Sequence, residues 1–182
     1  MADFNQAVQK TLVHEGGYQA NVHDTGNWEG GKETRDAYLA SKDPALLVHL
    51  KGTKFGITCH DMPGVEIKNL MAQDAIAYYS EHYWKALYSQ IVDQSIAEKL
   101  FDLGVLFGVG AAVKILQITI EQDISIVSDG NFGPTTLADV NQEGPDLLPR
   151  YKTTFIQHCI NIVNNNPADG VFVQGWINRI NS

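Results

Sequence analysis

The sequence predicts a mainly α-helical fold with one small loop or hairpin region. Apolar residues recur at helical spacing in several separate segments, and glycine or proline turns divide these segments. Only residues 54–59 have the apolar, β-branched character of a short strand. The chain has 182 residues, of which 44% are hydrophobic and 19% charged, so it can build one core, or one domain with a small appendage.

The first helix is expected to begin after Asp3, a suitable N-cap, and to stop at Gly16–Gly17. The members of its apolar face, spaced four residues apart, are Phe4, Val8 and Leu12. Glu15 therefore falls at the C-terminal end of this helix, where the chain turns into a loop. Residues 19–31 are rich in Asn, Asp and Gly, and we expect a loop or short hairpin there.

The middle of the chain is expected to hold three more helices. Two of them cover residues 32–50 and 69–88, where apolar residues lie along one stripe. Ser95 and Glu98 have the S-x-x-E spacing of a capping box, so a third helix is expected to begin there. It should end near Gly108, and Asp102 within it is expected to make a buried structural hydrogen bond.

The C-terminal part is also expected to be helical. The expected helices cover residues 111–122, a short segment from Pro134, residues 147–164 and a closing segment around Trp176. The turn before Pro134, Asp129–Gly133, is expected to be structural. The glycine-bearing turns near Gly108 mark the only candidate boundary, so we expect an N-terminal lobe of residues 1–108 and a C-terminal region of residues 109–182 packed on it.

Composition excludes several functions. The formal net charge of -8 predicts no nucleic-acid partner, which would need a basic face. The longest apolar runs fall short of the roughly 18 residues that a membrane span needs. Cys59 and Cys159 lie outside any C-x-x-C pattern, and we expect small buried side chains in a reducing compartment. The histidines lack zinc-site spacing and the Asp129–Gly133 turn lacks calcium ligands, so no metal or other cofactor is expected.

Glu15 and Asp24 form a candidate pair of carboxyl groups. Hydrolysis of a glycosidic bond uses one carboxyl as proton donor and a second on the other face of the sugar. Apolar neighbours on the first helix are expected to shield Glu15 from water, which favours the protonated form of a carboxyl, whereas Asp24 lies in an open loop. The residues alone leave two alternatives open: Glu15 as a solvated helix end, and Asp24 as an ordinary turn residue.

The two carboxyl groups lie within an ordered series of three short sequence motifs. The segment His14–Tyr18 is followed by Asp24 and then by Gly52–Thr58. This order resembles the N-acetylmuramidases of glycoside hydrolase family 108, which carry an E-G-G-Y segment, an aspartate shortly after it and a T-x-x-G-I segment. The eight residues between Glu15 and Asp24 also resemble the arrangement in phage-type lysozymes. The resemblance implies a lysozyme-like helical fold in which Glu15 is the general acid, Asp24 positions the attacking water and Thr53 assists it.

The resemblance extends over nearly the whole chain. The further segments that resemble the family are Tyr83–Trp84, Leu100–Asp102, Lys114–Gln117, Asp129–Leu137 and Gly175–Arg179. The last three belong to a part of the family described as a predicted peptidoglycan-binding region. Residues 1–108 are therefore expected to be the muramidase catalytic lobe with its cleft, and residues 109–182 the peptidoglycan-binding region.

One departure from the family pattern lies beside the expected cleft. About 25 residues, roughly 27–51, are inserted between Gly26 and Thr53. Aromatic rings suit sugar faces, so Tyr18 and, from the insert, Trp28 are candidate stacking residues. The insert also supplies three rival second carboxylates: Glu29, Glu33 and Asp36.

By this resemblance the chain cleaves the β-1,4 bond between N-acetylmuramic acid and N-acetylglucosamine in peptidoglycan glycan strands, with water as nucleophile. The alternative is a non-catalytic wall-binding or scaffolding protein with a degenerate muramidase fold, which the acidic charge and the insert favour. The segment Met1–Lys10 lacks the basic start and apolar stretch of a secretory signal. We therefore expect synthesis in the cytoplasm and release to the periplasm or wall through a holin or a secretion machine.

Overall fold

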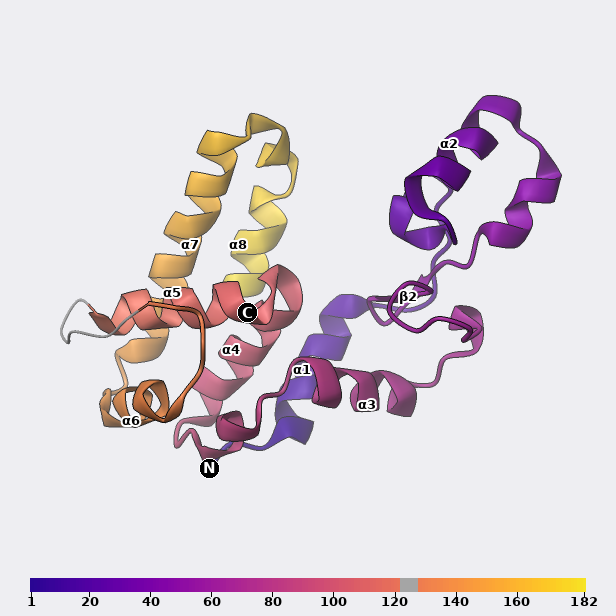
Figure 1. Ribbon diagram of the computed structural model, residues 1–182. Helices are drawn as coiled ribbons and strands as arrows, with labels where there is room; N and C mark the ends of the chain where they lie inside the picture. Colours follow the sequence, from indigo (N-terminus) through magenta and orange to yellow (C-terminus); the bar gives the residue numbers. More distant parts are fainter. Residues whose placement is uncertain (122–127) are drawn as a thin grey trace. The chain divides into compact units, whose positions relative to one another are not determined.

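The computed structural model describes residues 1–121 and 128–182, and this part of the chain is mainly α-helical, as predicted (Figure 1). It forms two compact units. The large unit consists of Met1–Lys10 and Tyr79–Ser182, and the small unit is Thr11–Tyr78. Helices α1 (Phe4–Glu15) and α3 (Ala72–His82) each contribute residues to both units. These compact units do not divide at residue 108. The boundary expected there, between a catalytic lobe and a peptidoglycan-binding region, stays a prediction.

The large unit is a bundle of helices around one core. Its further elements are the 3-10 helices η4 (Ala86–Gln90) and η5 (Pro167–Val171), with α4 (Gln94–Phe107), α5 (Val109–Glu121), α6 (Pro134–Gln142), α7 (Leu147–Asn165) and α8 (Val173–Asn181). Helix α4 packs on α5, and α7 runs beside α8 (Figure 1). In the core, the buried Tyr151 donates its hydroxyl hydrogen to the carbonyl oxygen of Ala112 at 2.9 Å. The last residue of the helix expected over 111–122 lies outside the described residues.

Helix α4 begins differently from the prediction. Its N-cap is Asp93, whose side chain accepts a hydrogen bond from the backbone N–H of Ser95 at 2.8 Å. Glu98 instead accepts hydrogen bonds from Gln94 and Lys10. The capping box expected at Ser95 and Glu98 is therefore wrong, because an aspartate two residues earlier accepts the Ser95 N–H that Glu98 would accept in a capping box. The predicted end of the helix is confirmed at Gly108, whose φ of 89° suits glycine.

The buried side chain of Gln117 fixes the turn after residue 128 through hydrogen bonds. Gln117 donates to Asp129, to the carbonyl of Asn131 and to Thr136, and its Oε1 accepts from the backbone N–H of Gly130 at 2.9 Å. Both polar atoms of the Gln117 amide are therefore engaged within the fold. The structural role expected for the turn is confirmed.

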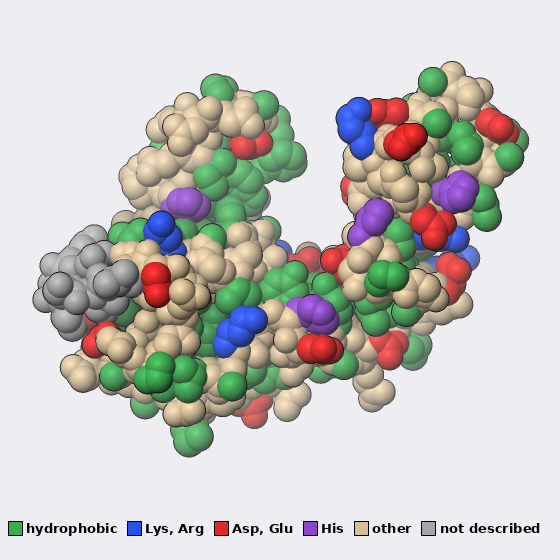
Figure 2. Space-filling model, viewed as in Figure 1, with side chains coloured by type: hydrophobic (Ala, Val, Ile, Leu, Met, Phe, Trp, Pro, Cys, Tyr) green, Lys and Arg blue, Asp and Glu red, His purple; other side chains and the backbone are tan. Residues whose placement is uncertain are grey.

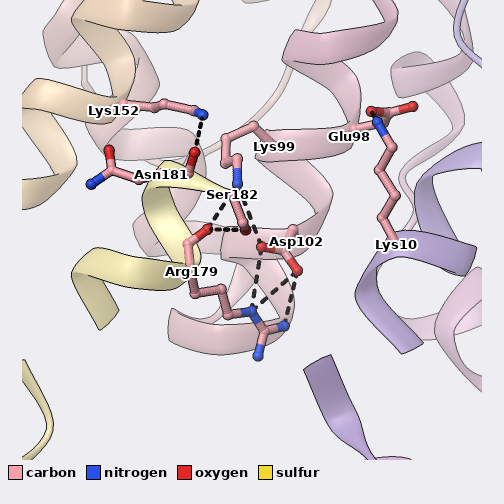
Figure 3. Close-up of polar contacts among 8 residues, drawn as sticks. All are labelled: Lys10, Glu98, Lys99, Asp102, Lys152, Arg179, Asn181 and Ser182. Atoms are coloured by element: carbon pink, nitrogen blue, oxygen red, sulfur yellow. Dashed lines mark hydrogen bonds and ion pairs between the residues drawn. The ribbon is translucent and has the colours of Figure 1, made fainter. Parts of the chain in front are cut away.

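Asp102 lies in a buried ionic cluster that ties α8 to α4 (Figure 3). Arg179 donates to both oxygens of the Asp102 carboxylate, at 3.0–3.3 Å. Lys99 donates to the carbonyl oxygen of Arg179 at 2.9 Å, and its ammonium lies 3.9 Å from Asp102. Ser182 donates to the same carbonyl at 2.8 Å. The buried structural role expected for Asp102 is thus confirmed.

The small unit combines short helices with one hairpin. Its elements, besides the ends of α1 and α3, are η1 (Thr25–Asn27), α2 (Gly31–Ser41), η2 (Pro44–His49), β1 (Thr53–Lys54), β2 (Ile57–Thr58) and η3 (Ile67–Asn69). Strands β1 and β2 pair antiparallel, with Thr53 opposite Thr58. The two residues of their turn, Phe55 and Gly56, both have positive φ, as a tight hairpin requires. A small core of Ile57, Ile67, Leu70 and Ala75 supports the hairpin.

Two of the predicted helices are shorter than expected. The helix over 32–50 ends at Ser41, and a 3-10 helix follows from Pro44. Asp43 precedes this proline, which disfavours helical backbone, and its side chain caps the next segment at the N–H of Ala45. The helix over 69–88 likewise divides into α3 and η4. Among residues 1–121 and 128–182, no helix is long and apolar enough to cross a membrane.

Candidate functional site

Glu15 is the last residue of α1, as the sequence predicts. Asp3 directly precedes the helix and its Oδ1 accepts from the backbone N–H of Gln6 at 3.1 Å, and the helix ends where Gly16 adopts a φ of 72°. This left-handed residue is a usual way to end a helix. The side chain of Glu15 is half-buried. A rigid helix end therefore holds the carboxyl at the start of the loop that carries the other candidates.

A backbone bridge brings residue 19 beside residue 53. The N–H of Gln19 donates to the carbonyl of Thr53 at 2.9 Å, and the N–H of Thr53 donates back to Gln19 at 2.8 Å. This exchange is one rung of an antiparallel ladder. It joins the loop after α1 to the start of β1, although the insert separates them in the sequence.

Asn27 connects the side chains around this rung. It is completely buried, and its Oδ1 accepts from Thr53 Oγ1 at 2.5 Å and from Gln19 Nε2 at 3.1 Å. Its Nδ2 donates to Gln19 Oε1 at 2.9 Å and to the carbonyl of Asn21 at 3.0 Å. Both donors and both acceptor positions of the amide are thus occupied. We call Gln19, Asn27 and Thr53, with Asp24, the Asn27 network.

Asp24 joins this network from the exposed side. It is the N-cap of η1, where its Oδ1 accepts from the backbone N–H of Gly26 at 2.9 Å. Its Oδ2 accepts from Gln19 Nε2 at 3.4 Å. The structure therefore brings Asp24 and Thr53 into one hydrogen-bonded set, and leaves the Asp24 carboxylate exposed to solvent.

Tyr18 lies against the backbone that leads into β1. A Cβ atom placed on Gly52 would lie 2.5 Å from Tyr18 Cε2 and 2.6 Å from the carbonyl oxygen of Gln19. Gly52 also has a φ of 76°, so glycine is required here for both space and conformation. The side chain of Tyr18 keeps 39% of its surface exposed. One part of the ring is thus packed, while another part is open.

Trp28 does not have the role that the sequence predicts. Its side chain is 0% exposed, its indole N–H donates to the carbonyl of Val22 at 3.0 Å, and its ring packs against Tyr38 at a centroid distance of 5.1 Å. The prediction that Trp28 stacks on a sugar is therefore wrong in this structure. The insert folds over this ring and uses it as its own core.

The three rival carboxylates have other surroundings. Asp36 accepts hydrogen bonds from Lys32 and Arg35, and these bonds, that of Lys32 first, lower the pKa of its carboxyl. Glu29 pairs with His49 at 3.2 Å. Glu33 is exposed in the first turn of α2. Asp24, by contrast, is bound to the Asn27 network, so the geometry favours it as the second carboxylate.

Two family models match the chain. Residues 8–108 match the model of Glycosyl hydrolase 108. The chain belongs to this glycosyl hydrolase family. Residues 111–181 match a second model, described as a Predicted Peptidoglycan domain. This member of glycosyl hydrolase family 108 is therefore a glycosidase of a peptidoglycan hydrolase family, and peptidoglycan is its partner.

A solved structure supports the fold of the family 108 chain. The structure titled "Structure of Brucella abortus SagA" is similar over 98% of this chain and 89% of that one, with a TM-score of 0.66 and 22% identity. At this identity the likeness shows the lysozyme-like, mainly helical fold alone. No curated protein matches the chain.

Sequence reasoning missed Gln19 and Asn27. Both lie in a loop without hydrophobic periodicity, where Asn and Gln are common turn residues. Asn27 is buried and Gln19 is exposed, and their hydrogen bonds depend on the rung between Gln19 and Thr53, which is a contact between distant parts of the sequence. A weak signal was present in Asn27 itself, because it directly precedes the large apolar Trp28 in an otherwise polar loop.

Proposed function

We propose that this family 108 glycosidase hydrolyses the β-1,4 bond between N-acetylmuramic acid and N-acetylglucosamine. Glu15 is the general acid and Asp24 positions the attacking water. The observation that carries this assignment is the Asn27 network, which joins Asp24 to Thr53 directly after the helix that ends at Glu15. The two carboxyl groups thus come from a rigid helix end and from a loop fixed by hydrogen bonds, as a two-carboxylate mechanism needs.

The reaction follows from these roles. The protonated Glu15 donates its proton to the glycosidic oxygen while the bond from C1 of N-acetylmuramic acid to that oxygen breaks. Water attacks C1 from the other face and its proton passes to Asp24. The products are a new reducing end and a free 4-hydroxyl group, and proton exchange with solvent then restores both carboxyl groups. Attack by water inverts the configuration at C1.

Thr53 assists through its oxygen. Its hydroxyl hydrogen is donated to Asn27 Oδ1, so its remaining lone pair can accept a hydrogen bond from the attacking water. Asp24 and Thr53 would then hold the water from two sides. The exposed part of the Tyr18 ring supplies an apolar face for a sugar.

The test uses the full chain on isolated sacculi, with Glu15→Gln and Asp24→Asn. Glu33→Gln is a matched control, because it removes an exposed carboxylate from the same unit outside the Asn27 network. Released reducing ends are measured over time. Loss of the acid or of the water-positioning group is expected to lower the rate by at least about 100-fold, with Glu33→Gln unchanged. Undiminished hydrolysis by Glu15→Gln would exclude Glu15 as the acid.

A second measurement tests the bond. Products are reduced with borohydride and analysed by mass spectrometry, and reduced N-acetylmuramic acid is the expected terminus. Reduced N-acetylglucosamine would show a glucosaminidase instead. If the wild type binds sacculi and releases no ends, the chain is the wall-binding protein that its net charge of -8 favours as an alternative. Release through a holin or a secretion machine remains a further proposal, for which cell fractionation is the test.

A further inference from the structure

A separate cavity of about 410 Å³ lies in the small unit. It is formed where the ends of the insert meet the loop that follows β2, and its lining includes Glu29, Lys51, His60, Val65 and Glu66. Cavities of this volume are in the range that binds small molecules. The residues of the Asn27 network do not line it, so it is distinct from the candidate catalytic residues.

The two ends of the insert form a short antiparallel ribbon. Trp28 and Leu50 bridge, the N–H of Glu29 donates to His49 at 2.8 Å, and the N–H of Lys51 donates to Asn27 at 2.8 Å. Side chains alternate across such a ribbon. Trp28 packs into the insert, whereas the Glu29 carboxylate meets the side chains of His49 at 3.2 Å and Lys51 at 3.9 Å.

The cavity is therefore next to the Asn27 network. Asn27, the last residue of η1, and Glu29 lie on either side of Trp28, the residue that bridges to Leu50. Asn27 contacts Thr53, and Glu29 opens onto the cavity. A molecule bound at the candidate catalytic residues can thus extend a substituent into the cavity.

The charges in the cavity have both signs. Lys51 is 28% exposed at its side chain, and its 3.9 Å separation from Glu29 exceeds hydrogen-bond length, so the ammonium keeps donors for another acceptor. Glu29 and Glu66 supply two carboxylates, and Pro63 and Val65 add apolar surface. Figure 2 shows side chains of both charges and histidines together on the lobe that carries α2.

We propose that this cavity binds a zwitterionic amino-acid group, as carried by the diamino acid of a peptidoglycan stem peptide. Glu29 and Glu66 bind its ammonium, Lys51 binds its carboxylate, and Val65 contacts the methylene chain. The context of this proposal, a stem peptide attached to the bound glycan, rests on the proposed function. A purely anionic ligand would be repelled by the two carboxylates, and a purely cationic one would place a second positive charge beside Lys51.

The direct test measures, by NMR titration, the binding of the free tripeptide alanyl-glutamyl-diaminopimelate. This tripeptide contains no glycosidic bond. Lys51→Met and Glu66→Gln are each expected to weaken binding at least about tenfold, because each removes a charge-assisted hydrogen bond. Lys68→Met and Glu33→Gln are matched controls outside the cavity lining. Two modified tripeptides are compared. In one the free amine of diaminopimelate is acetylated, and in the other the carboxylate next to that amine is amidated. Both are expected to bind as weakly as the variants bind the natural peptide.

The activity test compares sacculi with glycan strands stripped of peptide by an amidase. For Lys51→Met and Glu66→Gln, the ratio of kcat/KM on peptide-bearing over stripped glycan is expected to fall about tenfold. If the chain cuts glycan but the tripeptide shifts no signal of the cavity, or if the modified tripeptides bind equally well, the cavity proposal is wrong. If the tripeptide binds as described but no glycan is cut, the proposed function fails and the cavity assignment stands.

Discussion

Lys99 offers a direct test of how the buried ionic cluster contributes to stability. Its residue is 8% exposed, and it shares the cluster with one carboxylate, Asp102, and a second cation, Arg179. Burial lowers the pKa of Lys99 from 10.5 to about 8, although the charge of Asp102 opposes this shift. The cations that also lower it are Lys152, Arg179 and Lys10. The ammonium form is therefore unfavourable in the folded protein.

The sign of the pH dependence follows from this shift. Between pH 8 and 10.5 the unfolded chain keeps the Lys99 proton that the folded chain has released. The free energy of unfolding therefore rises with pH across this window, and the penalty is fully present below pH 8. A difference of 2.5 pKa units, from 10.5 to 8, corresponds to about 3 kcal/mol.

Lys99→Met should remove this penalty at little structural cost. The carbonyl of Arg179 loses one donor but keeps the hydroxyl of Ser182 at 2.8 Å, and Asp102 keeps Arg179. We expect a gain of about 1–2 kcal/mol in the free energy of unfolding at pH 7, after the loss of one hydrogen bond. The gain should shrink as the pH rises toward 10.5, because the folded wild-type lysine is neutral there and the cost of removing its proton falls as the pH approaches the unfolded pKa.

The assay is urea denaturation of both proteins at intervals from pH 7 to pH 10.5. The difference in the free energy of unfolding between the two proteins cancels the contributions of the other groups that titrate in this range. Lys114→Met, an exposed lysine on α5, is the matched control and should show neither the gain nor its pH dependence. A Lys99→Met protein that is less stable at pH 7, or a difference independent of pH, would refute the reasoning.

Three other substitutions test separate contacts. Asp102→Asn leaves the largely shielded Arg179 guanidinium without its counter-charge, so denaturation should show a loss of about 3 kcal/mol, reduced when combined with removal of the Lys99 charge. Gly52→Ala places a methyl group 2.5 Å from Tyr18 Cε2 at a φ of 76°, and should cost about 1–3 kcal/mol in the same assay, with a matching fall in glycan hydrolysis. Asn27→Asp sets an acceptor against Gln19 Oε1, so it should lose about 2 kcal/mol and most of the hydrolysis of sacculi; unchanged activity would contradict the role of the network.

The elements that sequence predicted best are those set by local chemistry. Asp3 and the glycine pair after Glu15 bound α1 as expected, because capping and left-handed backbone depend on a few adjacent residues. The capping box at Ser95 was wrong because Asp93, and not Glu98, accepts the hydrogen bond of the Ser95 N–H. A pattern match does not show which of two nearby caps prevails.

Long-range contacts explain what the sequence could not supply. Asp24 was a candidate from its spacing to Glu15, but its hydrogen-bonded connection to Thr53 passes through Gln19 and Asn27. That connection depends on pairing across the insert. The role of Trp28 also depends on long-range contacts, because they bury its side chain. An aromatic residue in a loop has the same local sequence pattern whether it faces a ligand or the insert's own core.

The insert itself shows how a departure from the family pattern can leave the candidate site intact. Its two ends are joined at the bridge between Trp28 and Leu50, so the chain leaves and returns at adjacent points. The backbone of Asn27 accepts from both Lys51 and Gly52, which fixes the start of β1 next to the loop of Asp24. The same pairing places Glu29 and Lys51 at the cavity. The segment that separates Asp24 from Thr53 in the sequence is therefore the one that brings them together, and it adds a charged cavity at their side.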